Sequence, residues 1–277
     1  MAERSATPCH AGPQPPPTPA MPTVNLRADR LDEEAARFDQ VPLTRPLFVN
    51  SVPKCGTHLL RNILRMFVPP AQHYARDFVQ YPNLAQTQEA FRQPLLSCGH
   101  LLFTDSTALV TAHVMRLLLV RDPYDWVLAR ARFFLSENFE SDMAELRDPR
   151  LSLEDLLSLM IFGIYRKAPS LSETFSHNAA AWLPGMHLLV RFEDLKAAVG
   201  TLDEAYFSRL LEACGIAMPA DWRERVRIGA DPAHSGTARV NLSGVARSLP
   251  DSLPETHRRL VDYEAPGLRQ LLGYIQP

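Results

Sequence analysis

Cysteine is scarce in this sequence and shows no pairing motif. The chain of 277 residues has four cysteines, at Cys9, Cys55, Cys98 and Cys214, and none of them forms a C-x-x-C motif. A chain of this length can bury a sizeable core without disulfides. Scattered cysteines in such a chain are typical of reduced thiols in the cytosol. We therefore expect a cytoplasmic protein without a disulfide framework.

Long apolar runs are also absent. The sequence contains no stretch of about 18 consecutive apolar residues, so we expect no transmembrane helix. Residues 1–22 lack the apolar segment that a secretory signal requires. Both observations favour a soluble protein.

Neither sign of charge dominates. Lysine and arginine total 29 and aspartate and glutamate total 31, which gives a formal net charge of −2 and a pI near 6.5. Without an overall basic field, nucleic acid is not expected as the main partner. Histidine, cysteine and carboxylate residues show no metal-site spacing, and Cys55 with His58 alone does not make a zinc site. We expect no metal.

Proline is abundant and concentrates at the N-terminus. Residues 1–22 hold seven of the 24 prolines and almost no large apolar side chain, so this segment cannot offset its ordering entropy. The charged stretch that follows predicts one short helix around residues 32–38. We predict a disordered tail and linker over residues 1–40 and a single folded domain over residues 41–277.

Within that domain, short apolar runs alternate with amphipathic stretches. Runs expected as buried strands cover residues 46–52, 95–99, 116–120 and 186–192. Helices are expected over residues 57–67, 123–135, 152–165, 172–183 and 254–275, the last with a break at Pro266. Strands separated by helices predict an α/β domain with a central parallel sheet flanked by helices.

The turn after the first strand has the residue types of a phosphate site. Lys54, Cys55, Gly56 and Thr57 join a predicted strand to a predicted helix, where backbone N–H groups and the helix dipole favour anions. Lys54 adds a mobile charge, Gly56 allows close backbone approach, and Thr57 adds a hydroxyl. The Walker A spacing G-x-x-x-x-G-K-S/T is missing. The alternative is an ordinary strand–helix turn with a surface lysine.

Two more candidates follow the ends of predicted strands. Arg121 comes directly after residues 116–120, at the edge where open α/β sheets bind ligands, and its guanidinium suits a phosphate. Its alternative role is an ion pair with Asp122 or Asp125. His100 follows residues 95–99 and can remove a proton at neutral pH, although a lone histidine is more often structural. His113 is a weaker candidate because it precedes its strand.

A turn-rich stretch near the C-terminus, residues 235–248, carries Arg239, Asn241, Gly244 and Arg247. It could fold over a ligand and bring a further cation to it. Its composition alone favours a plain surface loop.

In their order and spacing, these motifs resemble the PAPS-dependent sulfotransferase family. The family turn P-K-x-G-T, which cradles the 5′-phosphosulfate, is similar to residues 53–57. The family arginine that binds the 3′-phosphate in R-x-P-x-D matches Arg121, and the histidine base matches His100. The motifs Y-E-D-L and R-K-G-x-x-G are similar to residues 192–195 and 239–244. The likeness covers about residues 46–275.

The resemblance implies a P-loop-like fold, PAPS as the donor and PAP as the product. It implies His100 and Lys54 as catalytic residues. It further implies nucleotide contacts from Lys54, Cys55, Gly56, Thr57, His58, Arg121, Arg239, Asn241 and Gly244. The sequence departs from the family at Ala129, where the family has serine, at Phe192, where it has tyrosine, and at Val240 and Asn241.

The implied activity is transfer of a sulfuryl group to a hydroxyl or amine of a small-molecule, glycan or lipid acceptor. Residues 69–94 and 133–175 are expected to build the acceptor pocket. One alternative is a P-loop-type kinase that uses Asp122 to hold Mg²⁺. The other is a PAP-binding protein that has lost catalysis. The oligomeric state stays open, with a homodimer as one possibility.

Overall fold

The computed structural model describes residues 23–24, 29–74, 78–140, 143–235, 238–245 and 247–275. The predicted tail, residues 1–22, lies outside these ranges, so its disorder stays a prediction.

The centre of the fold is a parallel sheet with the strand order β3-β4-β2-β5-β7. Its strands are β3 (Val79–Gln80), β4 (Leu96–His100), β2 (Leu47–Ser51), β5 (Met115–Val120) and β7 (Leu188–Arg191). Every residue of β2 is buried, as expected for a central strand covered on both faces. The four predicted strands and the α/β class are confirmed. The short edge strand β3 was not predicted.

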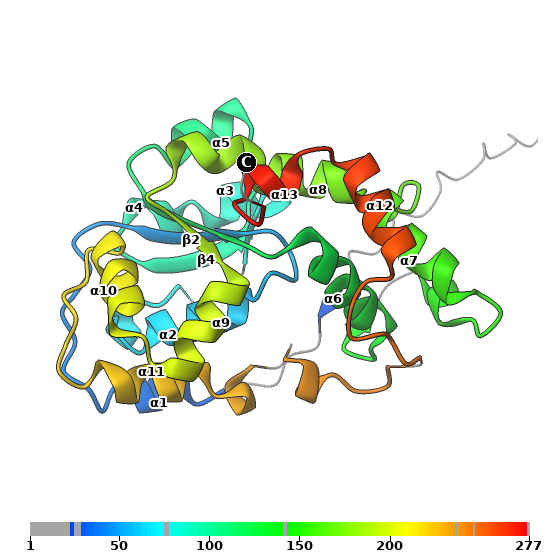
Figure 1. The fold of residues 1–277 in the computed structure, drawn as a ribbon. Coiled ribbons are helices and arrows are strands. Elements are labelled where there is room, and N and C mark those ends of the chain that lie inside the picture. The colour runs from blue at the N-terminus through cyan, green and yellow to red at the C-terminus, as the bar shows by residue number, and fades with distance from the viewer. Residues whose placement is uncertain are drawn as a thin grey trace, which may run out of the picture.

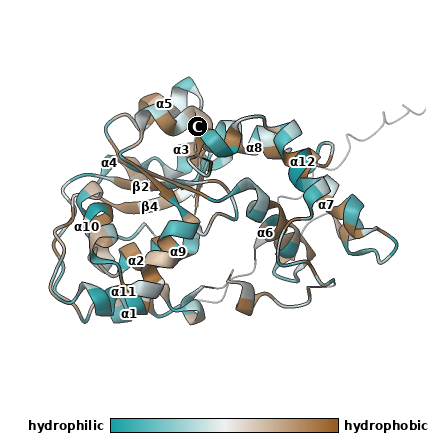
Figure 2. Cartoon of the chain, in the orientation of Figure 1, coloured by the Kyte–Doolittle hydropathy of each residue, from teal (hydrophilic) through white to brown (hydrophobic). Residues whose placement is uncertain are grey.

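Helices cover both faces of the sheet. They are α1 (Leu31–Ala35), α2 (Thr57–Arg65), α3 (Leu84–Thr87), α4 (Glu89–Arg92), α5 (Asp105–Val110), α6 (Pro123–Leu135), α7 (Leu153–Phe162), α8 (Leu171–Asn178), α9 (Phe192–Thr201), α10 (Glu204–Ala213), α11 (Trp222–Ala230), α12 (Glu255–Glu264) and α13 (Leu268–Leu271). In Figure 1, α2, α9 and α11 lie below the sheet and α5 lies above it. Figure 2 shows β2 and β4 in the brown of hydrophobic residues, with more hydrophilic colour on outer helices such as α1. None of the described helices is long and apolar enough to cross a membrane.

Local sequence signals explain where several helices begin and end. Helix α6 starts with Pro123, and the Asp122 carboxylate accepts a hydrogen bond from the Tyr124 N–H, so both residues favour a helix start. Helices α12 and α13 are separated around Pro266, as predicted. The helix expected over residues 172–183 ends at Asn178 instead and continues as 3-10 helix.

The predicted domain boundary at residue 41 is too late. Leu31 and Ala35 on α1 have no exposed surface, and the Arg65 guanidinium donates to Asp29 and Asp32 at 2.8 Å each. Arg65 is 7% exposed, so these carboxylates neutralise a nearly buried charge. Charged residues that suggested a solvated linker are instead partners of a cation in the domain.

Candidate nucleotide site at the carboxyl edge of the sheet

The turns after neighbouring strands meet at one edge of the sheet. Strands β4, β2, β5 and β7 are adjacent and parallel, so their carboxyl ends point the same way. Lys54 follows β2, His100 ends β4, Arg121 follows β5 and Phe192 follows β7. In open α/β sheets this edge is the usual ligand-binding position.

The turn between β2 and α2 has an unusual backbone. Lys54 has φ of 70° and Gly56 has φ of 96°, and Gly56 is the N-cap of α2 without a side-chain cap. A Cβ atom on Gly56 would lie 2.3 Å from the Phe192 ring, so only glycine fits. No side chain of the described residues caps the first backbone N–H groups of α2. These free donors favour an anion at the start of the helix.

One part of the sequence prediction for this turn is wrong. The Cys55 N–H donates to the Val52 carbonyl at 3.2 Å, so it closes the turn instead of facing an anion. Burial raises the pKa of the Cys55 thiol well above its usual value, which leaves an unreactive thiol.

The Lys54 ammonium rests on an aromatic ring. Its Nζ atom lies 2.9 Å from the centroid of the Phe133 ring on α6. Burial lowers the pKa of Lys54 to about 7, and no carboxylate of the described residues contributes an opposing shift. Helix α6 also braces the turn, because the Trp126 indole N–H donates to the Pro53 carbonyl at 2.6 Å. Among the described residues, Lys54 thus has no anionic partner.

A hydrogen-bond network at Ser51 joins the turn to His100. The Ser51 hydroxyl lies 2.7 Å from the Thr57 hydroxyl and 3.1 Å from Nδ1 of His100. The same Nδ1 lies 2.9 Å from the Ser51 carbonyl oxygen. Because a carbonyl can only accept, this geometry assigns the proton to Nδ1 and leaves a lone pair on Nε2.

The electrostatic surroundings keep His100 neutral. Burial lowers its pKa to about 4, the hydrogen bond to the Ser51 carbonyl acts in the opposite direction, and the Lys54 charge lowers it further. At pH 7 the imidazole is therefore unprotonated at Nε2 and able to accept a proton. Sequence analysis expected this role for His100, and the tautomer is compatible with it.

An aromatic cluster covers His100. The Phe78 ring stacks on the His100 ring, with centroids 5.5 Å apart and an angle of 10° between planes. The His58 ring meets the edge of Phe78 at 5.2 Å, and burial lowers the pKa of His58 to about 3, so it is neutral. No local motif in the sequence marks Phe78, so its contact with His100 was not predicted. His58, which the resemblance implied as a nucleotide contact, packs against Phe78 in this cluster, and its contact with a nucleotide stays a prediction.

Arg121 has a stacking partner and an unused donor. Its guanidinium carbon lies 4.5 Å from the centroid of the Phe192 ring, the same ring that packs against Gly56. Its buried Nε atom has no hydrogen-bond partner in the part of the chain that the structure describes. Burying a donor without a hydrogen-bond partner costs free energy. A bound ligand could supply the acceptor that this atom lacks.

The neighbouring Asp122 is already engaged. Its carboxylate forms an ion pair with Arg269 on α13 at 2.9 Å and caps α6 through the Tyr124 N–H. The alternative pairing of Arg121 with Asp122 is therefore not what the structure shows.

The turn-rich stretch near the C-terminus, here called the late loop, is held in place by hydrogen bonds to nearby backbone carbonyls. The Asn241 side-chain amide donates to the carbonyls of Pro232 and Ser235 at 2.6 and 2.7 Å, so it ties the loop together. Gly244 has φ of 58° and lies against Glu137, two residues after α6. The predicted contact from the Arg239 side chain lies outside what the structure describes. The described contacts of Asn241 and Gly244 do not join them to Lys54 or His100.

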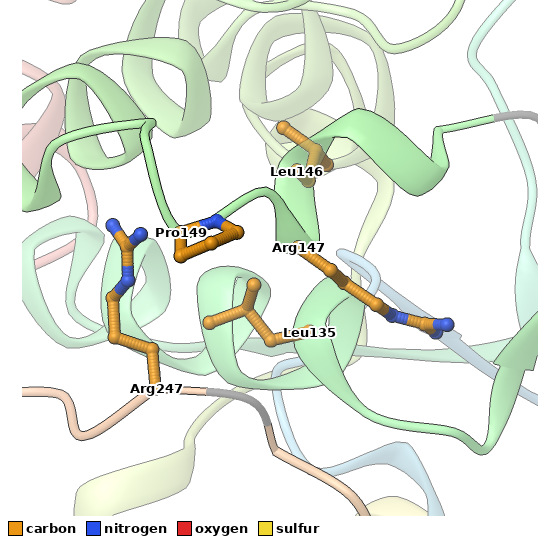
Figure 3. Close-up of a pocket in the computed structure, with 5 residues that line it drawn as sticks. All are labelled: Leu135, Leu146, Arg147, Pro149 and Arg247. Carbon is orange, nitrogen blue, oxygen red and sulfur yellow. The ribbon is translucent and has the colours of Figure 1, made fainter.

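Two cavities lie elsewhere. One of about 170 Å³ is lined by Leu135, Leu146, Arg147, Pro149 and Arg247 (Figure 3), and the Arg247 side chain there donates to the Asp148 carbonyl at 3.2 Å. In Figure 3 the two guanidinium groups point away from each other. The other cavity, of about 470 Å³, lies along β7, α9 and α10. Neither is lined by Lys54, His100 or Arg121. Within the described residues, no group of three or more His, Cys, Asp or Glu could hold a metal ion.

Comparison with known proteins tests the fold independently. Searches against protein-family models and curated proteins find no match. Among solved structures, retinol dehydratase in a complex with retinol and PAP is similar at a TM-score of 0.46 and 14% identity, over 84% of this chain and 83% of that chain. The mouse sulfotransferase SULT7A1 complexed with PAP is similar at a TM-score of 0.57 and 15% identity, over 88% of this chain and 92% of that chain. The likeness to this mouse protein, which extends over nearly the whole of both chains, shows that the chain has the sulfotransferase fold.

Proposed function

We propose that the protein is a PAPS-dependent sulfotransferase. It transfers a sulfuryl group to a hydroxyl or amine of a small-molecule, glycan or lipid acceptor. The observation that carries the proposal is the network at Ser51, which joins the hydroxyl of Thr57 in a phosphate-type turn to a neutral histidine base. The sulfotransferase fold supports it.

The residues at the sheet edge fit a doubly phosphorylated donor. Within the part of the chain that the structure describes, Lys54 has no carboxylate partner and the buried Nε of Arg121 has no acceptor. The two lie in turns that follow adjacent strands. We assign the 5′-phosphosulfate to Lys54, Thr57 and the N–H groups at the start of α2, and the 3′-phosphate to Arg121. Arg239, Asn241 and Gly244 remain proposed contacts from the late loop.

When bound, PAPS supplies the group transferred: the acceptor atom bonds to sulfur as the bond between sulfur and the 5′-phosphate oxygen breaks. His100 accepts the acceptor's proton at Nε2, and the Ser51 carbonyl steadies the positive charge through the Nδ1–H bond. Lys54 and the α2 amides neutralise charge that grows on the leaving phosphate oxygen. The ordered turn holds these donors in place beforehand, so little reorganisation is needed.

Two aromatic side chains support a proposal for where the acceptor binds. Phe78 stacks on His100, and Phe133 carries Lys54, so the two rings border the two catalytic residues. Apolar walls with a few polar groups are usual for small-molecule sites. We therefore propose an acceptor whose reactive hydroxyl or amine is attached to an apolar or aromatic body.

The kinase alternative receives no support from Asp122. Its carboxylate is paired with Arg269 and caps α6, so holding a metal ion would break both interactions. The missing Walker A spacing points the same way.

A thermal-shift comparison tests the nucleotide. PAP at about 100 times its Kd should stabilise the protein by about 2.7 kcal/mol, and ATP with Mg²⁺ should stabilise it much less. Equal shifts would favour a kinase. A radiolabelled PAPS transfer assay across phenols, alcohols, amines, glycans and lipids then tests catalysis. PAP binding without transfer to any of these acceptors would favour the protein that has lost catalysis.

A further inference from the structure

The C-terminal segment contacts residues beside the proposed nucleotide site. Figure 1 shows this red segment, with α13, folded back against the sheet. Arg269 holds Asp122, the residue after Arg121. Three residues past α13, the Tyr274 hydroxyl donates to the Glu193 carboxylate at 2.8 Å. Two links therefore connect the last helix to the strand ends that carry the site.

Glu193 is the bridge between these links. One of its carboxylate oxygens accepts from Tyr274, and the other accepts from the Asp122 N–H at 3.1 Å. Glu193 directly follows Phe192, and Asp122 directly follows Arg121. The carboxylate therefore fixes the neighbours of both members of the Arg121–Phe192 stack.

That stack is what presents the unused Arg121 donor. The Phe192 ring supports the guanidinium at 4.5 Å and packs against Gly56 in the phosphate turn. A small change in the backbone at residues 192–193 would move the ring and so alter both the guanidinium and the turn. A bidentate arginine contact depends strongly on such geometry.

We propose that Tyr274 is a positioning residue for the nucleotide site: through Glu193 it fixes the Arg121–Phe192 pair in the orientation that binds the 3′-phosphate. The inference rests on the proposed function. The tyrosine suits this task because burial, followed by the nearby Glu193, raises the pKa of its hydroxyl well above the usual value, so the hydroxyl always carries its proton. An exposed tyrosine on α12, Tyr263, offers a matched control at 78% exposure.

The test compares two ligands that differ only in the 3′-phosphate. PAP and adenosine 5′-monophosphate are titrated by calorimetry into the wild type, Tyr274→Phe, Tyr263→Phe, Arg121→Ala and the Tyr274→Phe/Arg121→Ala double variant. Tyr274→Phe should weaken PAP binding about five- to tenfold, which is less than the full worth of a hydrogen bond to a charged group because Tyr274 acts on Arg121 indirectly, and should weaken the monophosphate less than about twofold. Tyr263→Phe should change neither.

The double variant separates positioning from general stability. With Arg121 removed, Tyr274→Phe should change PAP affinity less than about twofold, because the two residues act on one contact. Equal weakening of both ligands, or full additivity in the double variant, would overturn the proposal even if melting temperature falls. A wild type that binds PAP no better than the monophosphate would overturn the proposed function together with the inference. A preference for PAP that is as large in Tyr274→Phe as in the wild type would overturn the inference alone.

Discussion

Lys54 should make PAP binding strongly pH-dependent above neutrality. Burial lowers its pKa to about 7 in the free protein. A bound phosphate would return that pKa toward the ordinary value of 10.5 or above, because the charged form gains a partner. Lys54 is protonated below pH 7 and neutral above it. PAP affinity should therefore be full below about pH 7 and should fall as pH rises.

The size of the effect follows from these two values. Between pH 7 and pH 9 the charged fraction of Lys54 in the free protein falls from about one half to about one hundredth, so the Kd for PAP should rise about 50-fold. PAP phosphates lose their last proton near pH 6 and do not titrate in this window. His58, at about 3, and His100, at about 4, titrate below it, and the pKa of Cys55 is raised well above its usual value.

Calorimetric titration from pH 7 to pH 9 measures this dependence. At pH 8, in buffers of different ionisation enthalpy, binding should take up about 0.9 proton. Lys54→Arg keeps its charge at every pH and should give a flat profile. Lys54→Met should bind PAP weakly with an equally flat profile. A wild-type Kd that changes less than about threefold, or a Lys54→Arg variant with the same slope, would refute the assignment of Lys54 as the phosphate cation.

His100→Ala should lower turnover about 10²- to 10⁴-fold while PAP affinity stays nearly unchanged, and His113→Ala should do neither. On the acid side, the wild-type kcat/KM should fall only as pH drops through about 4, the pKa of His100, whereas the fall above pH 7 reflects Lys54; an acid limb near 6.5 would argue against this base. Gly56→Ala should destabilise the protein in urea by about 1–2 kcal/mol or more, whereas Gly200→Ala, which meets open space, should not. Removing residues 1–40 should lower the melting temperature by several degrees, because α1 and its carboxylates are lost; an unchanged value would contradict their structural role.

Local signals were sufficient for the elements that carry the site. An apolar run bounded by turn residues identified β2, β4 and β5, and a proline at the first helical turn identified the start of α6. Since Lys54, His100 and Arg121 each follow a strand closely, their meeting at one edge could be predicted from parallel topology alone.

Contacts between distant residues could not be predicted in this way. Phe78 reaches His100 from the residue directly before an unpredicted edge strand, and Tyr274 reaches Glu193 across 81 residues. Neither pair has a sequence pattern that marks it. Helix α1 was assigned to a linker because its charges suggested solvent, whereas two of the nearby carboxylates pair with Arg65. The sequence shows which side chains are charged, but only the fold shows which charges meet.

Two departures from the sulfotransferase pattern remove a hydroxyl, and they differ in consequence. Phe192 lacks the tyrosine hydroxyl but keeps the ring, and the ring is the part that packs on Gly56 and supports Arg121. That replacement preserves the contacts on which the proposed phosphate site depends. Ala129 keeps no donor at all, so any hydrogen bond that serine makes there in the family has to come from another residue. The Nε of Arg121 then becomes more important, because it is a buried donor without a hydrogen-bond partner among the described residues, and a bound phosphate could supply the acceptor. The nucleotide site should therefore rest more heavily on Arg121, and on the residues that fix it, than the family pattern alone implies.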